Sequence, residues 1–227
     1  MFIIDNFIED ETLLKKLKKN RIKFFDNCYN YKNLGWEGTW WKGWWEEEAR
    51  NLHEELIQYI YWKYDFLKTS NPIKGFEYWT NLHSDKESLH LFEKEIMIEN
   101  QLGWHTNKDE HIFDTENKII APMQSMVMWP FSHMVEGGYL EITKVSEKDI
   151  VDEKSTPYKS FDKFRCRKCD RSFEKFPIER IEPKFNRIAI FDGSYLHRVS
   201  PIEKGDRWTF AVDVWDREIS MTKKGTY

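Results

Sequence analysis

The chain has 227 residues with a formal net charge of −4, and 33% of its residues are charged and 16% aromatic. Eleven tryptophans exclude the aromatic-poor composition of disordered chains, and the net negative charge offers no basic field for nucleic acid. The acidic start and the lack of a long apolar run exclude a signal peptide and a membrane span, so with only three cysteines we expect a cytoplasmic protein.

In the first half of the chain, segments whose apolar residues have the two-residue period of a strand are interspersed with segments that have the spacing of a helix. The expected elements are a strand over 2–4, a helix over 11–19, a helix over about 46–64, a strand over 75–82 and a helix over 84–100. The last helix rests on a capping box, in which Ser84 is followed three residues later by Glu87.

A tryptophan-rich stretch, GWEGTWWKGWW (35–45), separates the first two helices. Its indoles belong to Trp36, Trp40, Trp41, Trp44 and Trp45. They could line an aromatic substrate groove or pack over a sheet. Because tryptophan buries a large area wherever it lies, packing is the favoured interpretation.

The second half of the chain is rich in strand patterns and turn residues. Expected strands cover 118–129, 138–144, 187–192, a short segment that holds His197, and 207–215, with turns at 192–193 and 203–206. The charged, irregular segment from about 145 to 183 is expected to be an insertion on the rim.

These patterns predict one domain over 1–227 that is mainly β with flanking helices. An antiparallel sandwich or jelly roll fits best. We expect a helical, Trp-rich support over 1–72 and a β core over 73–217.

His197 and Arg207 stand ten residues apart in this final block. Antiparallel strands joined by a short loop would bring both side chains to one end of one sheet. Along 207–215, Arg207, Thr209, Ala211 and Asp213 share the smaller, more polar face, which could line a cavity. An imidazole beside a guanidinium suits a metal ligand next to an anion clamp.

A second candidate ligand, His105, lies upstream in the element GWHTNKDE (103–110). Two histidines from distant segments, with an oxygen ligand two positions after the first, form a facial triad. Such a triad leaves coordination positions open for a bidentate cosubstrate and O₂.

In combination these motifs resemble the Fe(II)/2-oxoglutarate-dependent dioxygenases, in particular the prolyl-4-hydroxylase-like branch. The motifs that carry the resemblance are the strand FEYW, the element Trp104-His105-Thr106-Asn107-Lys108-Asp109-Glu110, the strand SMVMWP (125–130), the Gly-Gly-x-Leu turn (137–140) and the closing block NRIAIFDG…LHRV…GDR.

The resemblance implies a double-stranded β-helix in which His105 and His197 bind Fe(II) and Arg207 pairs with the 5-carboxylate of 2-oxoglutarate. Trp129 stands where relatives often place a tyrosine hydroxyl against that carboxylate. The implied reaction uses O₂ to hydroxylate a C–H bond of a prolyl or other peptide or amino-acid substrate.

The sequence departs from the family at Asn107, where relatives carry an aspartate ligand. The change removes a negative charge from the metal's ligands and should weaken Fe(II) binding. Either the Asn107 amide oxygen ligates weakly, or Asp109 or Glu110 replaces it, or the position stays open for water or an anion. The first is preferred, because asparagine keeps an oxygen at this spacing.

Two other classes of function compete with the oxygenase. A catalytically impaired β-helix module would bind a metal, a small acid or a protein partner without turnover. A purely structural jelly roll, such as a capsid-type protein, would not bind 2-oxoglutarate at all.

A literal His-x-Asp also occurs at His83–Asp85, but the predicted helix start makes Asp85 an acid of the first helical turn. The remaining histidines are expected in packing or surface roles: His53, His90, His111 and His133.

The pair Cys166–Cys169 resembles half of a zinc knuckle. With Cys28 as the one possible third thiolate, a closed zinc site would need a histidine from elsewhere or a second molecule, so a reduced turn is preferred.

Overall fold

A computed structural model describes residues 1–26, 39–67, 72–86, 88–91, 94–97, 100–146, 150–151, 165–166 and 176–219. Its main feature is a pair of facing antiparallel sheets. The larger sheet has the order β1 (Phe2–Asp5), β13 (Arg187–Asp192), β7 (Gln124–Trp129), β15 (Ile202–Trp215), β3 (Gly75–Ser84) and β2 (Thr39–Trp41), and β8 (Val135–Gly137) pairs with the start of β15. The smaller sheet has the order β12 (Ile178–Ile181), β9 (Leu140–Ser146), β14 (Tyr195–Val199) and β6 (Leu102–His105).

Consecutive strands alternate between the two sheets: β12 lies in the smaller sheet, β13 in the larger, β14 in the smaller and β15 in the larger. This alternation winds the chain into a jelly roll, and the expected fold class is confirmed.

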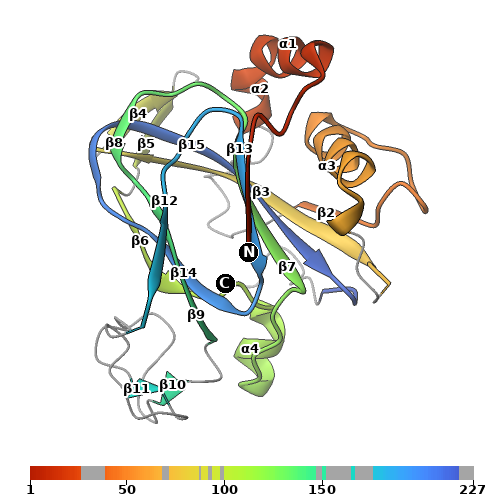
Figure 1. The fold of residues 1–227 in the computed structure, drawn as a ribbon, viewed down its shortest axis with the longest axis vertical. Helices are drawn as coiled ribbons and strands as arrows, with labels where there is room; N and C mark the ends of the chain where they lie inside the picture. The colour runs from red at the N-terminus through yellow and green to blue at the C-terminus, as the bar shows by residue number, and fades with distance from the viewer. Residues whose placement is uncertain are drawn as a thin grey trace.

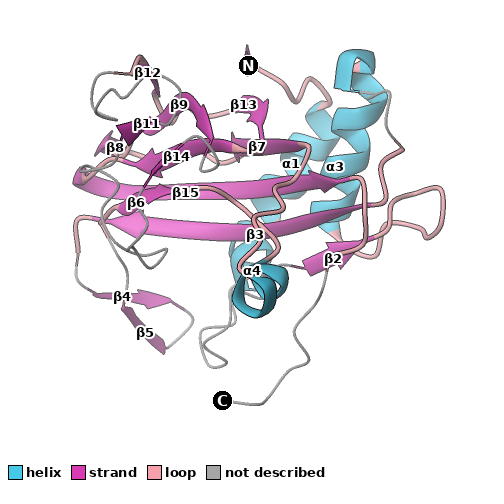
Figure 2. Cartoon of the chain, turned by 90° about the horizontal axis from the view of Figure 1, so that it is seen from below, coloured by secondary structure: helices cyan, strands magenta, loops and turns pink. Residues whose placement is uncertain are grey.

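The helices flank the larger sheet on the side away from the smaller one (Figure 1). These are α1 (Glu11–Lys19), α2 (Arg21–Asp26), α3 (Leu52–Lys63) and the 3-10 turn η2 (Asp65–Leu67). The helix α4 (Glu110–Glu116), which has no buried residue, lies apart from them at the lower edge of the view. Two short hairpins, β4 (Ser88–Leu91) with β5 (Lys94–Met97) and β10 (Ile150–Val151) with β11 (Arg165–Cys166), lie outside the sheets (Figures 1 and 2). No described helix has the length and apolar content that crossing a membrane requires.

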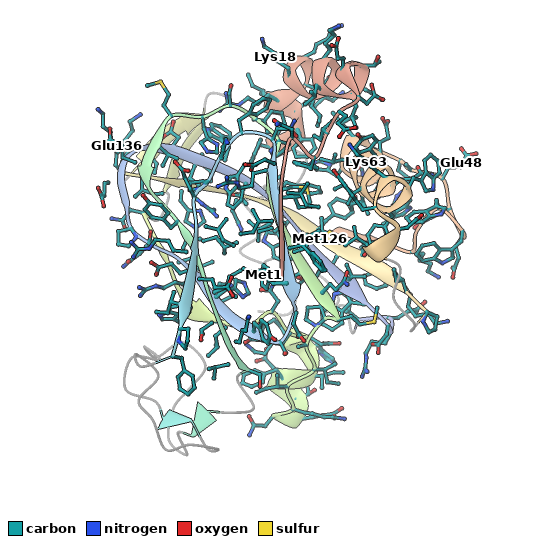
Figure 3. The ribbon with its side chains drawn as sticks, viewed as in Figure 1. Met1, Lys18, Glu48, Lys63, Met126 and Glu136 are labelled. Carbon is teal, nitrogen blue, oxygen red and sulfur yellow. The ribbon has the colours of Figure 1, made fainter. Side chains whose placement is uncertain are left out.

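Two apolar layers enclose the larger sheet, because side chains alternate along each strand. On β7, Met126 and Met128 pack toward the helices, whereas Val127 and Trp129 pack toward the smaller sheet. Figure 3 shows Met126 in the middle of the molecule and the charged Lys18, Glu48 and Glu136 at its periphery. The space between the sheets is therefore lined by the odd-numbered residues of β7.

The tryptophan-rich stretch packs on the helix side of the larger sheet. Trp41 is fully buried, and the rings of Trp41 and Trp44 lie 5.7 and 6.0 Å from that of Phe76. The packing interpretation is confirmed for these two residues, while Trp36 lies outside the described residues.

The helix predicted from Ser84 is wrong. β3 continues to Ser84, whose hydroxyl donates to the Asp206 carboxylate across the strand pair at 2.7 Å instead of capping a helix. Downstream, Leu89 and Ile96 are cross-strand partners of the β4–β5 hairpin. Tertiary pairing thus overrides a local signal for a helix.

The turn predicted at 203–206 is also wrong, because β15 runs unbroken from Ile202 to Trp215. Its first part pairs with β8, and Gly205, at a φ of +83°, allows the chain to bend before it joins β3 and β7. As a result His197 and Arg207 lie on facing sheets and not at one end of one sheet.

Several boundaries differ from those expected. The second helix begins at Leu52, because the Asn51 side chain accepts from the backbone N–H groups of His53 and Glu54. The strand expected over 118–129 begins only at Gln124, and 178–181 of the expected rim insertion belongs to the smaller sheet.

Candidate functional site

The two histidines meet at the inner side of the smaller sheet. His105 ends β6, His197 lies in β14, and the two are register partners whose ring centroids are 4.2 Å apart. The His197 ring also lies 5.1 Å from the ring of Phe191, which belongs to the apolar layer between the sheets. The imidazoles therefore face the space that the larger sheet closes from the other side.

Backbone carbonyls hold both imidazoles in the same tautomer. His105 Nδ1 lies 2.8 Å from the carbonyl oxygen of Gly103, and His197 Nδ1 lies 3.0 Å from that of Tyr195. Because a carbonyl oxygen only accepts, Nδ1 carries the proton in each ring and Nε2 keeps its lone pair. This is how proteins orient histidines that coordinate a metal through Nε2.

Both imidazoles are neutral at physiological pH. Desolvation lowers the pKa of His105, which is half-buried, to about 4. Burial, followed by the neighbouring His105, lowers the pKa of His197 well below its ordinary value. Neutral imidazole is the form that binds a metal ion.

Asn107 points its amide at the larger sheet. Its Nδ2 donates to Asp213 Oδ1 at 3.0 Å and lies 3.4 Å from Ser125 Oγ, which itself donates to the same oxygen at 2.6 Å. Asp213 is 1% exposed, and burial raises its pKa to about 7 although both hydrogen bonds act to lower it. A buried carboxyl group therefore stands beside the residue two positions after His105.

A second acid, Glu77, is the cross-strand neighbour of Asp213 on β3. Burial and then the charge of Asp213 raise the pKa of Glu77 to about 8. The inner face of the larger sheet thus carries two adjacent carboxyl groups at this end.

The acids that could replace Asn107 are engaged elsewhere. Asp109 caps α4 by accepting from the backbone N–H of Ile112 at 3.1 Å, and Glu110 pairs with Lys108 at 3.5 Å. Among the described residues, no three His, Cys, Asp or Glu side chains form a group that could hold a metal ion. An oxygen ligand beside the histidine pair would therefore be the Asn107 amide or solvent.

Arg207 lies on the inner face of β15 and is 1% exposed. Its guanidinium donates to Thr209 Oγ1 at 2.6 Å and lies 5.3 Å from the ring centre of Trp129. No carboxylate in the described part of the chain pairs with it, and burial lowers its pKa from 12.5 to about 9. Since a buried charge is costly without a counterion, this residue is suited to an anionic ligand.

His83 is the cross-strand partner of Arg207, and burial, then Arg207 and His105, lower its pKa to about 3. Its Nδ1 is buried without a hydrogen-bond partner. Asp85, in contrast, is exposed beyond the end of β3. The literal His-x-Asp therefore does not form a ligand pair, although its histidine lines the site.

Four residues of this site had no assigned role from the sequence: His83, Ser125, Thr209 and Asp213. The alternation along β15 had placed Thr209 and Asp213 on the face of Arg207, and that pattern was the signal available for them. Ser125 and His83 required knowledge of which strands pair with β15.

The site has two chemically different ends along β15. Arg207 and Asp213 are six residues apart on one face, which separates their backbones by about 20 Å in an extended strand. Asn107 ties the element that holds His105 to the Asp213 end. One row of inward-facing side chains thus runs from Arg207 through Thr209 to Asp213, and His83, the cross-strand partner of Arg207, feels the charges of both Arg207 and His105.

The donor set fits a divalent metal ion together with a dicarboxylate. Two neutral imidazoles with free Nε2 atoms and one amide oxygen would hold the metal, and Arg207 with Thr209 would hold the far carboxylate. The Nε–H of Arg207 is buried without a hydrogen-bond partner, and it is a donor that such an anion would satisfy.

The other histidines have ordinary surroundings. His53 Nε2 bonds the carbonyl oxygen of Phe24 at 2.7 Å, His133 Nε2 bonds that of Pro183 at 3.1 Å, and His111 is exposed. The side chain of His90 and the pair Cys28 and Cys169 lie outside the described residues, so the zinc-knuckle question stays a prediction.

No family model and no curated protein matches the chain. Among solved structures it is similar to a prolyl-4-hydroxylase from Pseudomonas putida, at 12% identity over 96% of this chain and 88% of that chain, with a TM-score of 0.47. It is also similar to a prolyl hydroxylase from Trichoplax adhaerens in complex with a hypoxia inducible factor oxygen degradation domain peptide fragment. The identity is 13% over 95% of this chain and 83% of that chain, with a TM-score of 0.46. A third similar structure is a 2OG-Fe(II) oxygenase family oxidoreductase from Burkholderia pseudomallei. The identity is 10% over 67% of this chain and 50% of that chain, with a TM-score of 0.35.

All three neighbours are oxygenases of the class that the sequence motifs resemble. Their identities to this chain are at most 13% and their TM-scores at most 0.47.

Proposed function

We propose that this protein is an Fe(II)- and 2-oxoglutarate-dependent oxygenase that hydroxylates a C–H bond. The observation that carries the proposal is the buried, unpaired guanidinium of Arg207 in the same inter-sheet space as two neutral histidines with free Nε2 atoms. A metal chelator with a second carboxylate complements both features, and 2-oxoglutarate is such a molecule.

The bound metal and cosubstrate would supply the oxidising chemistry, in which one oxygen atom of O₂ enters the substrate C–H bond and the other enters succinate as CO₂ is released. His105 and His197 would hold the metal, and their carbonyl partners keep the rings fixed. Arg207 and Thr209 fix the far end of the cosubstrate.

Apolar side chains surround this row and keep water from it. Val127, Ala189 and Phe191 of the larger sheet face Leu140 and Ile142 of the smaller one. Such exclusion strengthens the pairing of Arg207 with a carboxylate, because charges interact more strongly where water is absent.

The resemblance of the sequence motifs to the prolyl-4-hydroxylase-like branch supports a prolyl or other peptide side chain, or an amino acid, as the substrate. The tryptophan-rich stretch is not a wall of this site where it is described, since Trp41 and Trp44 pack on the opposite face of the larger sheet.

The test is succinate release from 2-oxoglutarate by anaerobically purified, iron-loaded protein after air is admitted, with and without candidate peptides. We expect release above that of the Arg207→Met variant, with Arg217→Met, an exposed arginine of the same chain end, as the matched control that behaves like the parent protein. Equal succinate from parent and Arg207→Met would refute the proposal.

Asn107 favours a second candidate, a binding module without turnover. This module would bind Mn(II) and 2-oxoglutarate in calorimetry and yet release no succinate with any substrate. A structural jelly roll would bind neither.

A further inference from the structure

Asp213 is a buried carboxylate that the proposed reaction has not yet used. It lies on β15 next to Asn107, at the end of the row opposite Arg207. No cation in the described part of the chain contributes to its ionisation, and its hydrogen bonds come only from neutral donors. A buried acid without a cation is costly to the fold, so its presence asks for a positive ligand.

Asp213 accepts hydrogen bonds from two side chains around it. Ser125 Oγ and Asn107 Nδ2 both donate to Oδ1, at 2.6 and 3.0 Å. The hydroxyl distance lies in the range of a charge-assisted O–H···O⁻ bond, roughly 2.5–2.7 Å. Both donors therefore favour negative charge at this position.

The same contacts orient the Asn107 amide. Nδ2 is tied to Asp213, and no described residue donates a hydrogen bond to the amide oxygen. Asn107 follows His105 by two residues, and His105 lies on the smaller sheet. The amide oxygen is thus left without a protein donor in the segment that follows His105.

On the basis of the proposed function, we propose that Asp213 is a positioning residue that takes over the charge missing at Asn107. Its carboxylate holds the amide with the oxygen directed at the metal and places one negative charge beside the ligands. The acid of the site would thus stand on β15, hydrogen-bonded to the residue two positions after His105.

This arrangement changes the expected effect of restoring the family's aspartate. Asn107→Asp alone would place two carboxylates where an amide N–H now meets a carboxylate at 3.0 Å. Like charges at that distance cannot both ionise freely. In the exchange Asn107→Asp/Asp213→Asn, the new amide at 213 donates to the new carboxylate at 107, and the bond is kept in reverse.

The experiment measures Mn(II) affinity by calorimetry, with the Co(II) absorption spectrum as a second readout of the ligand set. We expect Asp213→Asn to weaken Mn(II) binding about 10- to 100-fold, the effect typical of losing a partner of a metal ligand. The double exchange should bind at least as tightly as the parent protein and at least tenfold more tightly than Asn107→Asp alone.

Asp206→Asn is the matched control, because Asp206 also lies on β15 and accepts from a serine, 2.7 Å from Ser84 Oγ. We expect its Mn(II) affinity to stay within twofold of the parent protein. The comparison of the double exchange with Asn107→Asp differs only at position 213, so it decides the question even where the single Asp213→Asn variant does not fold.

Mn(II) affinity of a folded Asp213→Asn variant within twofold of the parent, or a double exchange no tighter than Asn107→Asp, overturns the role of Asp213 and leaves the proposed function standing. Failure of both the parent and the double exchange to bind Mn(II), with 2-oxoglutarate binding also absent, overturns the proposed function itself.

Discussion

Arg207→Met should abolish 2-oxoglutarate binding and at the same time stabilise the ligand-free protein. The guanidinium is 1% exposed, and no described carboxylate pairs with it. Methionine has a similar length and no charge, so the substitution removes the cost of burying the cation while it keeps most of the packing.

The magnitude follows from the structure. A pKa lowered from 12.5 to about 9 corresponds to roughly 5 kcal/mol against the charged form. The lost bond to Thr209 and the contact with the ring of Trp129 offset about 2–4 kcal/mol of this. We therefore expect a net gain of about 2 kcal/mol in the free energy of unfolding, or roughly 4–8 °C in the melting temperature.

The assay is thermal and denaturant unfolding with and without Mn(II) and 2-oxoglutarate. The parent protein should be stabilised by the cosubstrate, by about 2.7 kcal/mol at a concentration of 100 times its dissociation constant, and Arg207→Met should show no such gain. Arg217→Met, at an exposed site, should change unfolding by less than about 0.5 kcal/mol.

A ligand-free Arg207→Met protein that is less stable than its parent by about 1 kcal/mol or more would refute the reasoning. That result would mean that the guanidinium already has an anionic partner in the fold and is a structural residue instead of a receptor for a carboxylate.

Three further predictions concern stability, pH and the cosubstrate. Asn186 has a left-handed backbone at a φ of 57° and exchanges two hydrogen bonds of 2.9 Å with the backbone of Ile8. Asn186→Ala should therefore lower the free energy of unfolding by about 3 kcal/mol in chemical denaturation, and Asn186→Gly should lower it less. Equal losses in the two variants would exclude backbone strain. Burial lowers the pKa of His53 from 6.5 to about 4. Below pH 6.5 His53 is therefore protonated in the unfolded chain but stays neutral in the folded protein, so the free energy of unfolding falls. By about pH 5 this should cost about 2 kcal/mol, and the loss measured between pH 7 and 5 should shrink by that amount in His53→Gln; parallel stability curves would contradict the shift. Trp129→Phe should weaken 2-oxoglutarate binding about two- to fivefold in calorimetry, because the smaller ring attracts the cation of Arg207 less; unchanged affinity would remove Trp129 from the site.

Local patterns predicted much of the secondary structure. Leucines at helical spacing placed α1 at its observed bounds, Glu11–Lys19, and the apolar run Arg187–Asp192 placed β13. The helix expected from Ser84 failed, because the Ser84 hydroxyl that suggests a cap donates instead to Asp206 across the strand pair. The expected single-sheet location of His197 and Arg207 failed because a short connection can cross between sheets as readily as it can turn within one.

The sequence by itself determined which residues are the candidates for the proposed chemistry: two histidines, an arginine ten residues after the second, and an asparagine two residues after the first. Spacing along one strand was enough to place Arg207, Thr209 and Asp213 on one face, since side chains alternate wherever a strand forms.

Only the tertiary structure decided which of these residues touch. The pairing of β6 with β14 places the ring centroids of His105 and His197 4.2 Å apart. The stacking of the two sheets allows the Asn107 amide to donate to the Asp213 carboxyl group. These contacts join segments about a hundred residues apart, and they are selected by the burial of apolar layers on both faces of the larger sheet. A local sequence pattern cannot predict these contacts, because the burial that selects them depends on how all the strands pack together.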